Sequence, residues 1–119
     1  MTYWLYRAIA LLPLPIKYGL STTAAFLLRR VFRYRADVID TNLRNAFPER
    51  DTEWRRDTAA RFYRQFTDVT MEIVHASRMN LGDFKRRVTV EGLDELDRLT
   101  ENRTRSVIVL TIHLGNWEW

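Results

Sequence analysis

A chain of 119 residues is long enough for one small domain and rarely divides into two independent ones. It contains no cysteine, which excludes disulfides, thiolate metal sites and cysteine nucleophiles. The net charge of +4 is unevenly spread, because residues 1–35 carry basic side chains and no acid, a balance that suits anionic lipid head groups better than nucleic acid.

Residues 1–35 are interpreted as a hydrophobic, basic, membrane-associated segment. Their longest uncharged apolar runs, residues 8–16 and 18–28, are each shorter than the roughly 18 residues that a spanning helix requires. Pro13 and Pro15 predict a break between two helices, because proline interrupts helical hydrogen bonding. The segment is therefore expected to lie on the membrane or to re-enter it.

Interfacial residues support this membrane interpretation. Trp4 and Tyr18 have the amphipathic rings found at head-group level, and the basic residues from Arg29 to Arg35 predict a cytoplasmic side. Two alternatives stay open at this stage. The segment could be a cleaved signal peptide, or its helices could pack as ordinary core against the rest of the protein.

Two further helices are predicted in the middle of the chain. Residues 35–45 have near-helical apolar spacing, and the helix ends before Pro48. Asp51 or Thr52 offers an N-cap for a long amphipathic helix over residues 53–78. The mixed charges on its polar face are typical of a solvated surface, and we assign them no function. Its histidine is expected to be structural or at the surface.

The last third of the chain predicts a strand, a helix and a second strand. Residues 85–91 alternate, leucines outline a short helix over residues 93–99, and residues 107–112 form an apolar β-branched run. The predicted fold class is α/β, with membrane-associated helices followed by the start of a mixed or parallel sheet flanked by helices. Residues 36–119 are then an incomplete α/β domain, and we expect the protein to continue after Trp119.

The residues that could carry chemistry follow the second predicted strand. His113 stands at its carboxyl end, and Glu118 lies five residues further on. If Gly115 and Asn116 turn the chain, the carboxylate can accept a hydrogen bond from one imidazole nitrogen and leave the other as a general base. On spacing alone, such a pair is more often structural. No P-loop, GxGxxG, HExxH or GxSxG motif is present, so nucleotide and metal chemistry find no support.

Two separated segments carry a resemblance to a known family. HLGNWE at residues 113–118, preceded by an apolar run, and NLRNAFPE at residues 42–49 resemble the lipid A biosynthesis acyltransferase family. Its members are the late lauroyl and myristoyl transferases of lipopolysaccharide synthesis, within a wider group that shares a His-x4-acid motif. The resemblance covers the chain in order, as an N-terminal fragment of such an enzyme.

The resemblance implies transfer of a fatty acyl chain from an acyl thioester to a hydroxyl of a lipid A precursor. The donor carrier would be acyl carrier protein or coenzyme A, with the thioester as co-substrate and no cofactor, metal or nucleic acid. His113 would be the base and Glu118 its partner, with Gly115 and Asn116 shaping the substrate-binding turn. The expected location is the cytoplasmic face of the inner membrane, and the 119 residues alone are expected to be inactive.

Two alternative functions stay open. The same motif serves any acceptor hydroxyl, so the acceptor could be a lysophospholipid or an aminolipid. A different class is a non-catalytic membrane-binding module whose amphipathic helix binds a partner.

Overall fold

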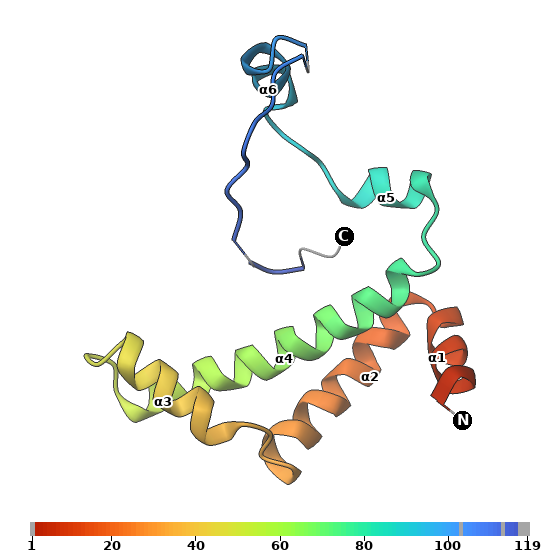
Figure 1. The fold of residues 1–119 in the computed structure, drawn as a ribbon. Coiled ribbons are helices and arrows are strands. Elements are labelled where there is room, and N and C mark those ends of the chain that lie inside the picture. Colours follow the sequence, from red (N-terminus) through yellow and green to blue (C-terminus); the bar gives the residue numbers. More distant parts are fainter. Residues whose placement is uncertain (1, 103, 113, 117–119) are drawn as a thin grey trace. The chain divides into compact units, whose positions relative to one another are not determined.

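The computed structural model describes residues 2–102, 104–112 and 114–116, and the chain divides into two compact units, Met1–Arg78 and Met79–Trp119. Figure 1 shows the elements as helices joined by short links. The first unit contains α1 (Thr2–Leu11), α2 (Leu14–Phe26), the π-helix η1 (Leu27–Val31), α3 (Ala36–Ala46) and α4 (Thr52–Ala76). The second unit contains α5 (Leu81–Arg87) and α6 (Leu93–Leu99).

The predicted break between the first two helices is confirmed. α1 ends at Leu11, and α2 begins at Leu14 after Pro13, whose extended backbone (φ −57°, ψ 147°) is not helical. Pro15 lies in the first turn of α2, where the missing N–H group costs no helical hydrogen bond. No helix within the described residues has both the length and the apolar character needed to cross a bilayer. The interfacial location of residues 1–35 stays a prediction.

The two middle helices also form where the sequence predicts them. α3 ends at Ala46, and its last turn is closed by a hydrogen bond from Phe47 N to Leu43 O (2.9 Å). α4 begins at Thr52, and the carboxylate of Asp51 caps it by accepting from Trp54 N at 2.7 Å. Such a cap satisfies one of the backbone N–H groups left unpaired at a helix start.

α2 and α4 run antiparallel and side by side, as Figure 1 shows. Contacts pair the start of α2 with the end of α4: Tyr18 Oη donates to Glu72 at 2.6 Å, and Ser21 lies 3.0 Å from Thr67 between the hydroxyl oxygens. The Ser21 hydroxyl also donates to Asp68. The centre of this interface is thus polar, and Ala25 adds a small apolar contact.

The second unit begins with a short capped helix, α5, and an irregular link leads from it to α6. The side chain of Asn80 accepts from Asp83 N while Asp83 reaches back to Asn80 N, which is a capping box. Gly92, with φ at +76°, starts α6 in the left-handed region that glycine adopts without a steric penalty. α6 forms where the leucine spacing predicts a helix.

The predicted α/β fold class is wrong. The described residues contain helices, turns and irregular segments but no β-strand, so they form no sheet. Residues 85–91, predicted as a strand, belong partly to α5, because the Asn80 capping box starts a helix that runs to Arg87. Residues 106–112 are irregular.

The error has a physical cause. A β-branched run has strand propensity, but a strand forms only when a neighbouring strand accepts its backbone hydrogen bonds and its side chains find a packed surface. Within the described residues nothing meets residues 107–112 in this way, and Ile108 and Leu110 are 89% and 94% exposed. The division into residues 1–35 and 36–119, which rested on membrane association, stays a prediction.

Candidate functional site

The predicted catalytic pair, His113 and Glu118, lies outside the described residues. The two residues predicted to shape the turn between them are described. Gly115 has a φ of +68°, and a Cβ at this position would meet no described atom within 4 Å. The backbone conformation, rather than lack of space, therefore favours glycine here. The half-buried Asn116 follows it, and the roles of all four residues stay predictions.

A second candidate site is a basic cavity in the first unit, which we call the arginine pocket. Its volume is 360 Å³, and it is formed where η1 and the following turn meet α3 and α4. It is lined by Arg29, Arg30, Arg33, Ala36, Ile39, Asp40, Arg55, Arg56, Ala59 and Tyr63. Five guanidinium groups and one carboxylate give the cavity a strong positive charge, which suits an anionic ligand.

Two residues that line the arginine pocket make hydrogen bonds to neighbouring segments. Tyr63 is 3% exposed, and its hydroxyl donates to the carbonyl oxygen of Tyr34 at 2.7 Å. Burial raises the pKa of the Tyr63 hydroxyl, and the charges of Arg29 and Arg33 oppose this rise. The Arg29 guanidinium also donates to the backbone oxygen of Arg56 at 3.3 Å, which joins η1 to α4.

An apolar cavity of 390 Å³ lies beside the arginine pocket, and Ile39 lines both. Its lining is mainly aliphatic and aromatic and comprises Tyr34, Arg35, Val38, Ile39, Asn42, Leu43, Thr58, Phe62 and Phe66. Tyr34 and Phe62 each stack on Phe66, with ring centroids 6.3 and 6.0 Å apart. The segment NLRNAFPE at residues 42–49 thus supplies part of a cavity wall through Asn42 and Leu43.

A buried polar cluster lies where α1, α2 and α4 meet. Lys17 is fully buried, and its ammonium group donates to Ala10 O and to His75 Nδ1, both at 3.0 Å. The second bond requires the His75 tautomer that carries its proton on Nε2. Burial, and secondarily the charge of Arg78, lower the pKa of Lys17 below its usual 10.5. His75 thus contributes a hydrogen bond to this cluster, and its structural or surface role stays a prediction.

Sequence reasoning missed both the arginine pocket and the Lys17 cluster. The sequence predicts a membrane face for the basic residues of 29–35 and a solvated face for those of α4, whereas residues from both groups line one cavity. The available signal for Lys17 was a single lysine inside an apolar run. Among the described residues no three His, Cys, Asp or Glu side chains are grouped to hold a metal ion, and the absence of a metal from the mechanism stays a prediction.

Comparison with known families gives the class of protein. The chain matches the model of an acyltransferase family, the bacterial lipid A biosynthesis acyltransferases, over residues 1–119. Because the match spans all 119 residues, this chain belongs to the bacterial lipid A biosynthesis acyltransferase family. The resemblance carried by HLGNWE and NLRNAFPE is thereby confirmed. Comparisons with curated proteins and with solved structures returned no match.

Family membership supports a general statement about activity. The family consists of transferases of lipid A and lipopolysaccharide biosynthesis, so a lipid acceptor and an acyl donor are its substrates in general terms.

Proposed function

We propose that the protein transfers a fatty acyl chain from an acyl thioester, carried by acyl carrier protein, to a hydroxyl of a lipid A precursor. The reaction takes place at the cytoplasmic face of the inner membrane. The observation that carries this proposal is the family match over residues 1–119, which includes the segment HLGNWE. The thioester is a co-substrate, and the chemistry requires no cofactor.

In the proposed mechanism His113 is the general base. It takes the proton of the acceptor hydroxyl as the oxygen attacks the thioester carbonyl, and a tetrahedral intermediate forms. The carbon–sulfur bond then breaks, and the leaving thiolate takes the proton from the imidazolium. Glu118 holds the imidazole in the required tautomer and stabilises its charged form. A histidine suits this task because its unperturbed pKa lies close to neutral pH.

Gly115 and Asn116 lie between these two residues in the chain. The positive φ of Gly115 turns the backbone within the motif, which supports the proposed return of Glu118 toward the base. Backbone N–H groups of such a turn can stabilise the negative charge that develops on the carbonyl oxygen.

The test is an acyl-transfer assay with the full-length protein in membranes. Wild type is given acyl carrier protein or coenzyme A thioesters with either a lipid A precursor or a lysophospholipid. We expect transfer from the acyl carrier protein thioester to the lipid A precursor. Product only with the lysophospholipid would replace the proposed acceptor, and no product with any pair would favour the non-catalytic module.

Variants assign the roles within the motif. We expect Glu118→Gln to lower the transfer rate, because the amide can orient the imidazole but does not stabilise its charge. The matched control is Glu91→Gln, the same substitution at an exposed glutamate, and it should leave the transfer rate unchanged. Equal rates for wild type and Glu118→Gln would refute the role of the carboxylate.

A further inference from the structure

No step of the proposed acyl-transfer mechanism uses the arginine pocket, so its charge calls for a separate explanation. We propose that it binds the phosphate group of an anionic membrane lipid. The ligand class follows from the lining, because guanidinium groups form paired hydrogen bonds with phosphate oxygens. The cavity of 360 Å³ has room for a phosphate and part of a head group, since a water molecule occupies about 30 Å³.

The arginine pocket has more positive charge than its own acid can neutralise. Its single carboxylate, Asp40, pairs with Arg55 at 3.3 Å and with Arg44 outside the pocket. In the part of the chain that the structure describes, Arg30, Arg33 and Arg56 form no ion pair. Three guanidinium groups therefore remain available to an external anion.

The backbone holds these arginines at one place by an irregular link. η1 is a π-helix, and Arg33 and Arg35 in the turn after it have φ values of +47° and +52°. Residues other than glycine rarely adopt this region, and both π-helices and such conformations are enriched at functional sites. The link brings Arg29, Arg30 and Arg33 to the wall formed by Arg55 and Arg56 of α4.

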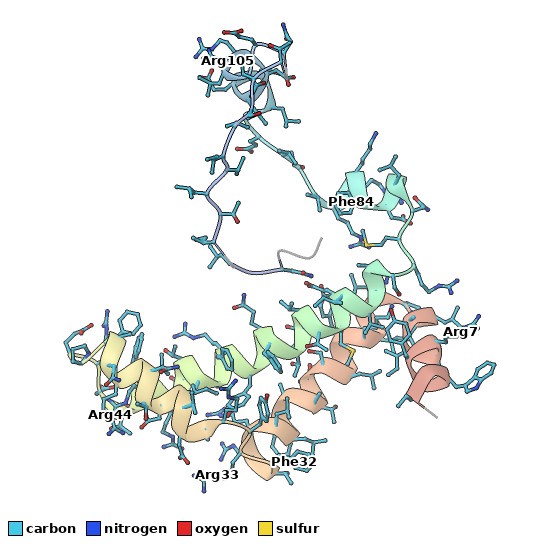
Figure 2. The ribbon with its side chains drawn as sticks, viewed as in Figure 1. Arg7, Phe32, Arg33, Arg44, Phe84 and Arg105 are labelled. Carbon is cyan, nitrogen blue, oxygen red and sulfur yellow. The ribbon has the colours of Figure 1, made fainter. Side chains whose placement is uncertain are left out.

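Apolar side chains beside the pocket indicate that the phosphate belongs to a lipid. Phe26, Val31 and Phe32 are 60%, 59% and 68% exposed, and they lie on the same segment as the pocket arginines. Figure 2 shows Phe32 next to Arg33 in the turn after η1. A basic pocket bordered by exposed rings can bind a head group while the rings enter the boundary of the acyl chains.

The experiment measures vesicle binding of the full chain by flotation. One set of vesicles contains phosphatidylcholine with phosphatidic acid, and the other contains phosphatidylcholine with oleate at a matched zeta potential. We expect tighter binding to phosphatidic acid. We expect Arg56→Gln to weaken that binding about tenfold, because it removes a charge next to the bound phosphate together with paired hydrogen bonds to its oxygens.

The matched control is Arg61→Gln. Both arginines are exposed on α4 and the charge change is the same, but Arg61 does not line the pocket. We expect less than about a twofold effect from it, by electrostatic screening at physiological salt. Equal losses for the two variants, or equal binding to the two vesicle sets, would overturn phosphate recognition in the pocket. Circular dichroism checks that both variants fold as wild type does.

Further measurements distinguish a lipid phosphate from soluble phosphate and from an acidic protein partner. Phe32→Ser is expected to weaken binding to both vesicle sets, because it removes apolar contact rather than phosphate contact. Release of the protein from phosphatidic acid vesicles by inorganic phosphate, at constant ionic strength, would indicate a site for soluble phosphate and overturn the lipid assignment. Binding of acyl carrier protein that is lost in Arg56→Gln, with unchanged vesicle binding, would overturn it in favour of an acidic protein partner.

This inference rests on the proposed membrane location for its ligand class but not on acyl transfer. Vesicle binding is measured without an acyl donor. Phosphatidic acid binding can therefore be lost while acyl transfer persists, and acyl transfer can be absent while phosphatidic acid binding persists. His113→Ala is expected to leave vesicle binding unchanged.

Discussion

Lys17 places an ammonium group at a fully buried position in the contact of α1, α2 and α4. Two hydrogen bonds, to Ala10 and His75, compensate part of the cost of removing this charge from water. Burial and the charge of Arg78 still lower its pKa. The folded state therefore releases the Lys17 proton at a lower pH than the unfolded state does, and stability depends on pH through this group.

Lys17→Met is predicted to remove that pH dependence. In wild type the unfolding free energy rises with pH from the lowered pKa of Lys17 up to 10.5, because the unfolded state binds the proton more tightly in that range. The stability linked to neutral Lys17 is present above 10.5 and is lost as pH falls through the folded-state pKa. Denaturant unfolding at neutral pH and just below 10.5 measures the difference between the proteins.

The matched control is Lys85→Met, which removes the other, exposed lysine. Both variants keep Tyr63, whose pKa is raised above 10.0. Its contribution to the pH dependence of stability is therefore the same in all three proteins and cancels in each comparison. A stability difference between wild type and Lys17→Met that is constant across the pH range would contradict the role of burial.

Gly115 allows a prediction from backbone conformation alone. Its φ of +68° costs L-residues about 1–2 kcal/mol, and asparagine tolerates the region better than alanine or valine. We expect the acyl-transfer rate to fall in the order Gly115→Asn, Gly115→Ala, Gly115→Val, with about a tenfold loss for valine. Gly19→Ala adds the same methyl group within α2, where it meets no described atom within 4 Å, and it should not slow transfer. Equal rates along the Gly115 series would show that the turn is not required.

For single residues, the sequence predicts interactions between neighbours in the chain. It misses interactions that depend on the packing of distant segments. The Asp51 cap can be predicted because its partner, Trp54 N, is three residues away. The arginine pocket joins residues 29–33 to residues 55–56, and only the antiparallel packing of α2 and η1 on α4 brings them together. The burial of Lys17 depends on the same packing.

At the scale of elements, the α2–α4 interface is held by small and polar residues. Ser21 contacts Thr67 and Asp68, and Ala25 is 8% exposed next to α4. Small side chains allow two helices to approach closely, and polar side chains fix their register by hydrogen bonds. The start of α2 therefore meets the end of α4 in a defined alignment.

Ala25→Leu is predicted to destabilise the first unit by about 1–3 kcal/mol, because the larger side chain forces the two helices apart. Thr22→Leu is the matched control, since Thr22 is exposed on the same helix and leucine is the better helix former. Thermal unfolding of the full chain measures both. An unchanged midpoint in Ala25→Leu would mean that this interface does not depend on close approach.

The helices of the first unit could be predicted from the sequence, whereas α5 was missed and the predicted strands do not form within the described residues, for one physical reason. A helix closes its hydrogen bonds within its own segment, so apolar spacing, Pro13 and the Asp51 cap suffice to locate α1 to α4. A strand closes its hydrogen bonds with another segment. The apolar run at residues 107–112 has the composition of a strand, but no described segment pairs with it.

At the scale of the whole molecule, family membership and local structure support different statements. The match over residues 1–119 establishes that the chain belongs to an acyltransferase family of lipid A biosynthesis. The structure describes a helical first unit with an arginine pocket, and a second unit that leads into the HLGNWE segment. The sequence identified the family through HLGNWE and NLRNAFPE, while His113 and Glu118 keep the roles proposed from that motif.

The most direct test of the proposed function is the rate of acyl transfer from an acyl carrier protein thioester to a lipid A precursor, with wild type beside His113→Ala in the full-length protein. Loss of a general base predicts a fall on the order of 10²- to 10⁴-fold, with vesicle binding unchanged. Equal rates for the two proteins would contradict the proposal that His113 is the catalytic base.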